Sequence, residues 1–360
     1  MTERPIDPLA LMRATPDALN VPGGMLTKQG PQKYVGAVPA IAGTLFFNDA
    51  HLHEVRKAIC DCFDTYLITA TPQLTWLLRE DPPEGPDRMA FEKAKPLKAM
   101  LAKMDEDDFV SFWYTSGKAV HDAGPWEFQV IGIPAWRAKM GGWGLCGLRF
   151  SVPLLFVEEY PEAFQELFVT CANYLRAEHG YAGHALVLSA LRYDENQAFE
   201  AFLTSKMRGF DAGGLVSGAV NAHLGIKTVS WLTAINRDYL EKVGGESTVR
   251  SELPMDWFRL LEYENGVVIQ AGPQPEAAPA DAPLPARMVL PDMLLQPVRT
   301  PQVRLHYASA ESEPRLIGKA AERWLTRFDV PRDQLLAVKA QLLSEPKLSA
   351  KLNTGKTFGF

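Results

Sequence analysis

Residues 179–184 read His-Gly-Tyr-Ala-Gly-His and are the first of four short segments that decide how this chain folds. The other three are residues 208–211, 226–233 and 322–329. In the first segment, Gly180 is placed to cap a preceding helix and Gly183 to allow a tight turn before a strand. His179 and His184 are then helix-end and loop residues. We predict that the glycines of these segments form turns and that their aromatic residues are buried, so the segments specify the fold. None of them is a catalytic motif.

The composition is that of a globular protein with a large core. The chain has 360 residues, of which 47% are hydrophobic, so it allows one large domain or two to three smaller ones. Its formal net charge of −6 argues against a nucleic-acid-binding surface, which needs clustered Lys and Arg. Four cysteines are too few for a disulfide scaffold, and we expect them to be reduced.

The sequence suggests no targeting or membrane-spanning segment. The N-terminus carries acidic residues and prolines where a secretory signal needs a basic start and an apolar run of about 7–15 residues. The longest apolar stretches, residues 109–114 and 186–191, are far shorter than the roughly 20 residues that cross a bilayer. We therefore expect a soluble, cytoplasmic protein that binds no membrane.

Hydrophobic periodicity predicts an α+β fold with a mixed or antiparallel sheet flanked by helices. Strands are expected at residues 41–48, 74–79, 109–114, 126–133, 145–152, 185–189, 228–234 and 267–270. Helices are expected at residues 51–66, 91–101, 158–176, 196–206, 316–328 and 333–343. The strands at 109–114 and 126–133 could form a hairpin. The strand–helix–strand order of residues 41–79 recurs over 145–189, which suggests two pseudo-duplicated strand–helix–strand halves.

Composition also predicts where the folded body begins and ends. Residues 1–39 are rich in Pro and Gly without periodicity and are expected to form a loosely ordered arm. Residues 40–345 are expected to form a single α+β domain. Within it, residues 272–286 are rich in Pro and Ala and should form an exposed loop. Residues 346–360 are expected to be a tail.

One stretch of the sequence imitates a metal site without completing it. His51, His53 and Glu54 suggest metal ligands, and His53-Glu54 would begin the zinc protease motif HExxH. The fourth position after His53 is Lys57, however, which cannot replace the second imidazole. The preceding Asn48 and Asp49 are better explained as helix caps. We predict no metal ligands.

Glycine-rich stretches and serines likewise give no active site. Residues 139–147 precede a strand, whereas a phosphate loop follows a strand and opens a helix. Residues 211–225 match neither dinucleotide-binding nor Walker spacing and are predicted to be an irregular loop. A GxSxG nucleophile elbow is absent. We predict no catalytic residues and no cofactor, so a binding protein is favoured over an enzyme.

Two acidic groups and two tryptophans are the candidate contacts for a partner. The denser group is Asp105, Glu106, Asp107 and Asp108, and the other is Glu158, Glu159 and Glu162. Either group can be simply a solvated surface, and the second also complements a helix dipole. Trp136 and Trp143 lie near predicted loops, where an aromatic residue either seals the core or anchors a partner. A basic partner would be attracted to either acidic group.

In their order and intervals, the four segments resemble the TsiV-type family of bacterial type VI secretion immunity proteins. Further similarity lies in residues 43–78, in Phe150-Ser151-Val152-Pro153 with the following helix, and in residues 267–273. The resemblance covers roughly residues 38–330. It implies an antidote that binds a type VI effector, which carries a VRR-NUC nuclease domain in the best-known members. Inhibition would be steric, with acidic residues imitating phosphates on the DNA-binding and metal-binding face of the toxin.

The resemblance brings no catalytic residues to this chain. The Pro/Ala-rich residues 272–286 and the chain beyond 345 depart from the family pattern, so the interface and the toxin can differ. Two other functions remain possible from the sequence. The protein could be an adaptor or structural component of the secretion machinery, or an enzyme without a recognisable motif. The oligomeric state is not predicted.

Overall fold

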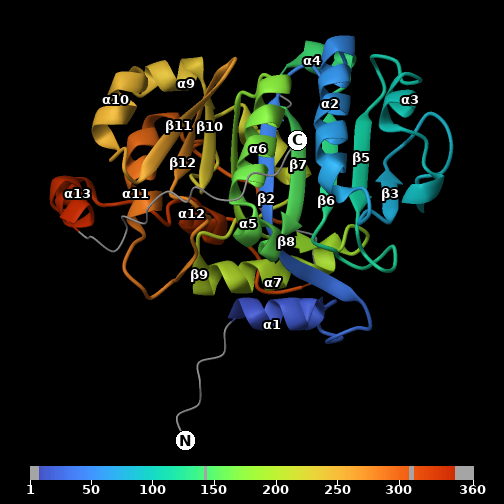
Figure 1. Ribbon diagram of the computed structural model, residues 1–360, viewed down its shortest axis with the longest axis horizontal. Coiled ribbons are helices and arrows are strands. Elements are labelled where there is room, and N and C mark those ends of the chain that lie inside the picture. The colour runs from blue at the N-terminus through green and yellow to red at the C-terminus, as the bar shows by residue number, and fades with distance from the viewer. Residues whose placement is uncertain (1–7, 142–143, 308–311, 345–360) are drawn as a thin grey trace, which may run out of the picture.

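The computed structural model describes residues 8–141, 144–307 and 312–344 (Figure 1). In these residues, eleven strands form one sheet in the order β11-β12-β10-β8-β2-β7-β6-β5-β3-β4, with β1 paired to β2. Every ladder of this sheet is antiparallel. The strands up to β6 are β1 (Val21–Pro22), β2 (Val35–Phe47), β3 (Trp76–Arg79), β4 (Arg88–Ala90), β5 (Val110–Thr115) and β6 (Glu127–Gly132). The remaining ones are β7 (Cys146–Pro153), β8 (His179–Leu188), β10 (Leu232–Asn236), β11 (Phe258–Tyr263) and β12 (Gly266–Ala271).

The sheet is built around β2, which lies between β7 and β8. Ala40 pairs with Pro153 on one side and with Ala185 on the other. Its second half is continuously buried, with apolar side chains on both faces, as expected for a strand covered on both sides. The central strand therefore connects two hydrophobic cores.

One face of the sheet is covered by α2 (His53–Ala70), α3 (Leu97–Leu101), α5 (Leu154–Glu159) and α6 (Pro161–Tyr174) (Figure 1). Aromatic rings fill the space beneath α2. Phe63 stacks on Tyr114 with ring centroids 4.3 Å apart, and Tyr66 donates a hydrogen bond of 2.9 Å to the carbonyl of Ser151. This buried hydroxyl is thereby satisfied, and α2 is fixed to β7.

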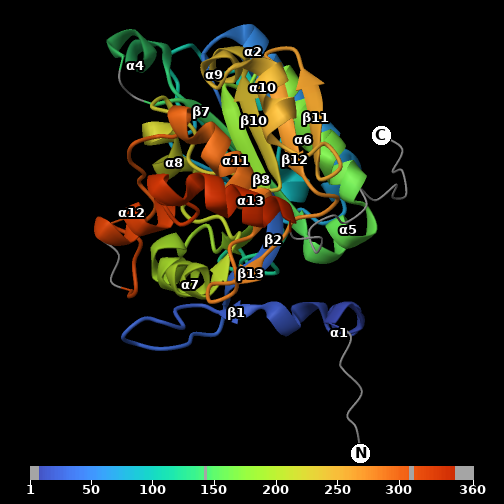
Figure 2. The same ribbon diagram turned by 90° about the vertical axis from the view of Figure 1, so that its left-hand side faces the viewer.

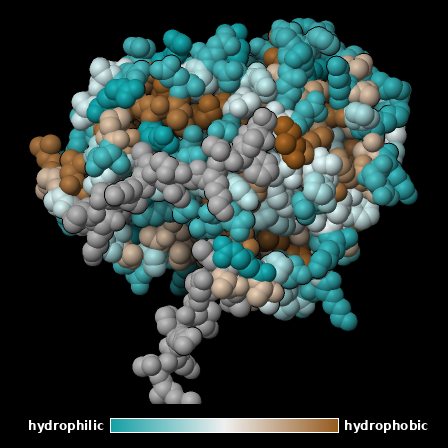
Figure 3. Space-filling model, viewed as in Figure 1, coloured by the Kyte–Doolittle hydropathy of each residue, from teal (hydrophilic) through white to brown (hydrophobic). Residues whose placement is uncertain are grey.

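The opposite face carries the helices of the second half of the chain (Figure 2). These are α7 (Tyr193–Lys206), α8 (Leu215–Ala222), α9 (Arg237–Lys242), α10 (Gly245–Glu252), α11 (Ala286–Leu295), α12 (Lys319–Leu325) and α13 (Leu335–Ser344). A small sheet of β9 (Met207–Arg208) and β13 (Ala278–Pro279) lies beside α7. Apolar residues also reach the surface in patches, one of them over α13, where Leu336 is 86% exposed (Figure 3). The N-terminal α1 (Pro8–Ala14) and α4 (Ala135–Met140) complete the helices described.

The α+β fold and the antiparallel sheet predicted from the sequence are confirmed, as is the β5–β6 hairpin. The strand–helix–strand units are also present, because α2 connects β2 to β3, and α5 with α6 connects β7 to β8. Their places in the sheet differ. β7 and β8 are separated by one strand, whereas β2 and β3 are separated by β7, β6 and β5. The two units therefore do not repeat the same strand order.

Several local predictions were wrong. Residues 179–184 are the first part of β8, with no helix cap or turn. Residues 211–225, predicted to be a loop, contain α8. The folded body begins before residue 40, because β2 starts at Val35 and already pairs with β1. By contrast, the loop predicted at 272–286 is present, although the two residues of β13 lie within it and α11 begins at Ala286.

Gly180 lies in β8 because the neighbouring strand leaves no space for a side chain. A Cβ atom there would approach the Thr44 carbonyl oxygen to 2.5 Å and Leu45 Cδ2 to 2.7 Å. We expect Gly180→Ala to lower the free energy of unfolding by about 1–3 kcal/mol through overpacking. Urea denaturation measures this effect.

Gly218 provides a control on the opposite face of the sheet. It lies inside α8, and the nearest atom to an added Cβ is a Phe46 ring carbon at 3.5 Å, an ordinary contact. Gly218→Ala should be neutral or stabilising by about 0.5–1 kcal/mol, because alanine is the better helix former. Equal losses for both variants would contradict this explanation of Gly180.

Candidate functional site

The densest acidic group of the chain forms an ordered turn. Residues 105–108 (Asp-Glu-Asp-Asp), here called the acidic turn, connect the α3 region to β5. The Asp105 amide donates to Asp108 Oδ2 and the Asp107 amide donates to Asp105 Oδ1, both at 2.9 Å. Asp105, Glu106 and Asp107 are exposed. Two of the four carboxylates thus fix the backbone, and the turn presents negative charge to solvent.

A buried arginine fastens the acidic turn to α2. Arg56, only 8% exposed, donates from Nη1 to the Met104 carbonyl at 2.6 Å and from Nη2 to the Asp105 carbonyl. Its Nε donates to the Ala50 carbonyl at 3.2 Å. Burial lowers the pKa of the guanidinium, and the carboxylates of Asp108 and Asp105 offset part of that effect. Because these contacts reach backbone carbonyls, the turn has a fixed position on the body.

The same turn positions an exposed tryptophan. The amide of Ala135, the first residue of α4, donates to the Glu106 carbonyl at 2.8 Å, and the Trp136 amide donates to Asp107 Oδ1 at 3.2 Å. The Trp136 side chain is 45% exposed, with the Arg137 guanidinium 5.3 Å from its ring. Five of the predicted contact residues therefore form one surface, the acidic turn together with Trp136, which we call the α4 surface.

The second acidic group lies elsewhere. Glu158 and Glu159 are on α5 and Glu162 is on α6, at the other end of the molecule from α4 (Figures 1 and 2). Glu159 forms an ion pair of 3.5 Å with Arg13 of α1. Trp143 lies outside the described residues. The structure thus separates the predicted contacts into two regions, and only the first combines acidic residues with an exposed aromatic side chain.

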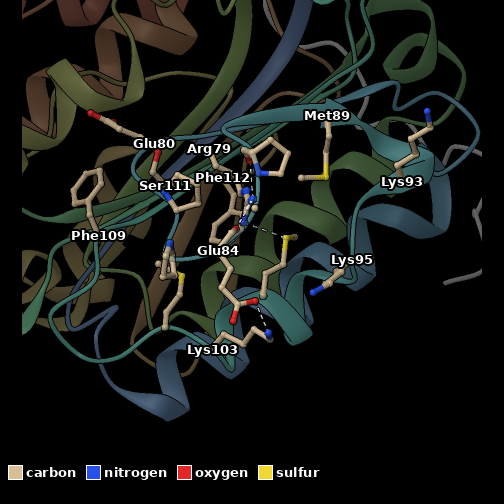
Figure 4. A pocket seen from close by; sticks show the side chains of 16 residues that line it. Arg79, Glu80, Glu84, Met89, Lys93, Lys95, Lys103, Phe109, Ser111 and Phe112 are labelled. Atoms are coloured by element: carbon tan, nitrogen blue, oxygen red, sulfur yellow. Dashed lines mark hydrogen bonds and ion pairs between the residues drawn. The ribbon is translucent and has the colours of Figure 1, made fainter.

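A pocket adjoins the acidic turn (Figure 4). Met104 and Phe109, the residues on either side of the turn, line a cavity of about 380 Å³. Apolar side chains form much of its wall, and Lys93, Lys95 and Lys103 stand at its rim (Figure 4). Arg79 supports the loop over the cavity by donating to the Glu84 and Pro86 carbonyls at 2.9 and 2.7 Å. The α4 surface therefore continues into a hollow that can accept an apolar side chain.

No metal centre is found among residues 8–141, 144–307 and 312–344, which contain no group of three His, Cys, Asp or Glu placed to hold an ion. His53 is the first residue of α2. The residue at the N-cap is Leu52, without a side-chain hydrogen bond, so the predicted capping by Asn48 and Asp49 was wrong. All four cysteines are buried free thiols.

His179 is a core residue of β8. It is fully buried, and its Nε2 lies 2.8 Å from the Ala222 carbonyl. Since a carbonyl only accepts, Nε2 carries the hydrogen. Burial lowers the pKa of His179 to about 4 from 6.5, and the hydrogen bond offsets only part of this shift. A neutral histidine in the core therefore replaces the helix-end residue predicted.

The His179 pKa makes stability depend on pH. Its folded pKa lies below its unfolded pKa, so the unfolded chain binds the extra proton between these values. The stability that neutral, buried His179 contributes to the folded state is fully present above pH 6.5 and is lost as pH falls toward 4. The loss is about 1.4 kcal/mol per pH unit. Urea denaturation at successive pH values should show a shallower loss for His179→Gln than for the wild type. Exposed His223 gives the control, and a His223→Gln variant with the same flattening would contradict the assignment.

The four segments that carry the sequence pattern meet around one buried lysine. Lys227 Nζ lies 2.7 Å from Asp211 Oδ1, 4.4 Å from the Tyr181 ring centroid and 5.5 Å from that of Trp324. Arg327 Nη2 donates to Thr228 Oγ1 at 2.8 Å. Each segment contributes to this arrangement, which we call the Lys227 cluster. Sequence spacing gave no sign of it, because its members come from distant parts of the chain.

The Lys227 cluster extends to the sheet through a second buried cation. Arg149 of β7 lies 3.4 Å from both Glu127 and Asp211. Burial lowers the pKa of Arg149, but the attraction of Glu127 and Asp211 is stronger, and the net pKa is raised. Burial also lowers the pKa of Lys227, with Asp211 offsetting part of the shift. The small cavity that Lys227 itself lines holds only about 10 Å³, so the buried charges of Lys227, Asp211 and Arg149 form a structural ion network with no room for a substrate between them.

Comparison with known proteins agrees with the sequence resemblance. A family model described as type VI immunity for VRR-NUC matches residues 58–328. No curated protein matches the chain. Among solved structures, a Pseudomonas aeruginosa T6SS protein is 42% identical, covers 95% of this chain and 96% of its own length, and superposes with a TM-score of 0.85. In the described part of the chain, no helix combines the length and apolarity needed to cross a bilayer.

Proposed function

The chain belongs to the TsiV family of type VI immunity proteins, and on this premise we propose that it binds one cognate type VI toxin and blocks it sterically. The proposed target is a nuclease, in line with the VRR-NUC of the family description. A nuclease must be inhibited where DNA is exposed to it, so the proposed place of action is the cytoplasm of the producing cell. The proposed role involves no catalysis.

The observation that carries the proposal is the α4 surface. A nuclease binds DNA through clustered cations, and the acidic turn offers fixed carboxylates to such a face. Trp136 and the adjoining cavity supply the apolar contacts that hold a complex together once charge has brought the partners into contact. A stable complex of this kind buries roughly 1,200–2,000 Å² in total, so the toxin would cover α4 and its surroundings. The carboxylates would then occupy the place of DNA phosphates.

Co-expression with the toxin encoded beside this gene tests the proposal. Survival of the cells, together with a stable complex on a sizing column, is the expected result. An adaptor of the secretion machinery would instead bind the apparatus and leave the toxin lethal. Death without a complex, with the protein folded by circular dichroism, contradicts the role of antidote for that toxin.

The acidic turn should control the rate at which the toxin binds. The test variant combines Asp105→Asn, Glu106→Gln, Asp107→Asn and Asp108→Asn, since amide oxygens can still accept the two hydrogen bonds that fix the turn. We expect association at low salt to slow by about tenfold or more and to lose most of its salt dependence. Stopped-flow mixing with a catalytically inactive toxin measures both quantities.

The second acidic group gives the matched control. Glu158→Gln, Glu159→Gln and Glu162→Gln together remove charge at the opposite end of the molecule and should leave association nearly unchanged. If this triple variant slows association while the acidic-turn variant does not, the interface lies at α5 and α6 and the α4 surface is not the toxin-binding site.

A further inference from the structure

A second cavity is lined by residues of α7 and α12. Both helices lie on the sheet face opposite α2 and α6 (Figure 2). The volume of the cavity is about 450 Å³, which is within the range of small-molecule sites. It is distant in sequence from the acidic turn and shares no lining residue with the cavity beside that turn. We call it the α7–α12 pocket.

The walls of this pocket are positively charged. Arg315, Arg323 and Arg327 all line it, and none of its described lining residues carries a carboxylate. Arg315 is paired with Glu313, whereas the side chain of Arg323, on α12, is exposed to solvent. The chain as a whole has a formal net charge of −6. The three guanidinium groups around this cavity therefore give it a positive charge on a chain that is negative as a whole. Guanidinium groups bind oxyanions through paired N–H donors.

Buried donors at the same cavity lack acceptors. Arg327 lies against the Trp324 ring, 3.7 Å from its centroid, and donates from Nη1 to the Trp324 carbonyl and from Nη2 to Thr228. Within the described residues, Arg327 Nε and Trp324 Nε1 are buried and have no hydrogen-bond partner. Both atoms belong to residues that line the cavity, and buried donors are usually satisfied. Burial also lowers the pKa of Arg327 to about 10, a shift that a bound anion would oppose.

We propose that the α7–α12 pocket binds a phosphate group, either inorganic phosphate or a small phosphate monoester, with Arg323 and Arg327 as its principal donors. The sign of the charge matches, because the guanidiniums of Arg323 and Arg327 line the cavity and phosphate is an anion. The cavity is larger than a phosphate ion, so it also has space for the organic part of a monoester. This site goes beyond toxin neutralisation and does not depend on it.

Isothermal titration calorimetry of the full chain tests the proposal in phosphate-free, low-salt buffer. The probes are inorganic phosphate, adenosine 5′-monophosphate and uncharged adenosine. We expect phosphate or the monophosphate to bind with a Kd of about 1 mM or tighter, and adenosine not to bind. Tighter binding of the monophosphate identifies a monoester site, whereas tighter binding of phosphate identifies a site for the free ion.

Two variants on the same helix make the assignment specific. Arg323→Ala should weaken binding at least about tenfold, and Arg323→Lys should retain part of the affinity because it keeps the charge without the planar fork. Lys319→Ala removes one positive charge from α12 at a position that does not line the pocket. This variant should therefore bind phosphate with the same affinity as the wild type. Absence of binding in the wild type, or equal losses in Arg323→Ala and Lys319→Ala, would overturn the proposal. Since Arg323 is exposed, its loss leaves the fold intact, and a thermal melt verifies this.

Discussion

Replacing Asp211 by alanine is expected to lower the free energy of unfolding by about 3–5 kcal/mol. Asp211 lies 2.7 Å from Lys227 and 3.4 Å from Arg149, and all three side chains are at most 8% exposed. After its removal Arg149 still has the buried carboxylate of Glu127, whereas Lys227 loses the carboxylate with which it forms an ion pair. An unpaired charge in the interior costs far more than the loss of one contact. Urea denaturation followed by tryptophan fluorescence measures the change.

A surface ion pair gives the control for this prediction. Asp61 pairs with Lys57 along α2, and the lysine side chain is 69% exposed. Asp61→Ala should therefore cost less than about 1 kcal/mol, because solvent screens such pairs. If Asp211→Ala costs no more than Asp61→Ala, the buried ion pairs of the Lys227 cluster do not stabilise the fold.

Replacing Trp136 by alanine is expected to weaken toxin binding by about 30-fold or more, a loss of about 2 kcal/mol. The side chain is 45% exposed in the free protein, so its removal should change the free energy of unfolding little. Its amide hydrogen bond to Asp107 is made by the backbone and survives the substitution. Affinity is measured by calorimetry with an inactive toxin.

Tyr174 is the matched control for Trp136. It is 42% exposed at the end of α6, on a different part of the surface. Tyr174→Ala should leave toxin affinity within about threefold of the wild type, as for an exposed residue outside the interface. Unchanged affinity in Trp136→Ala would remove this side chain from the interface, and a loss confined to Tyr174→Ala would relocate the interface to α6.

The sequence predicted those parts of the fold that depend on local patterns. Helical spacing identified α2 through Ile59, Phe63 and Tyr66, which pack into the core. Two neighbouring strand-like runs predicted the β5–β6 hairpin. Both signals are short-range, because side chains repeat every 3.6 residues in a helix and every two in a strand.

Tertiary context overrode the local signal at other positions. Gly180 and Gly183 are residues typical of a turn, yet they lie in β8. Glycine is needed there because neighbouring segments of the same chain approach too closely for a side chain. The glycines of residues 211–225 likewise concealed α8. Local sequence cannot distinguish a glycine required by close packing from one required by a turn.

The candidate sites differ in how far the sequence indicated them. The residues of the acidic turn and Trp136 were each visible, but their contact through Asp107 depends on where α4 begins. The Lys227 cluster was not visible, because Asp211, Lys227 and Arg149 come from three separate elements or loops. Ion pairs between distant residues have no periodicity, so only the fold reveals them.

The central position of β2 also determines when this protein can fold during its synthesis. The ribosome releases β2 early, but its neighbours are residues 146–153 and 179–188, far along the chain. Until β8 has emerged, β2 and the apolar face of α2 lack their partners, and such long-range strand pairing is slow and prone to aggregation. We therefore expect the nascent first half to stay without its central strand pairing until residue 188 is available. The centre of the sheet can therefore form only after about half of the 360 residues have been made.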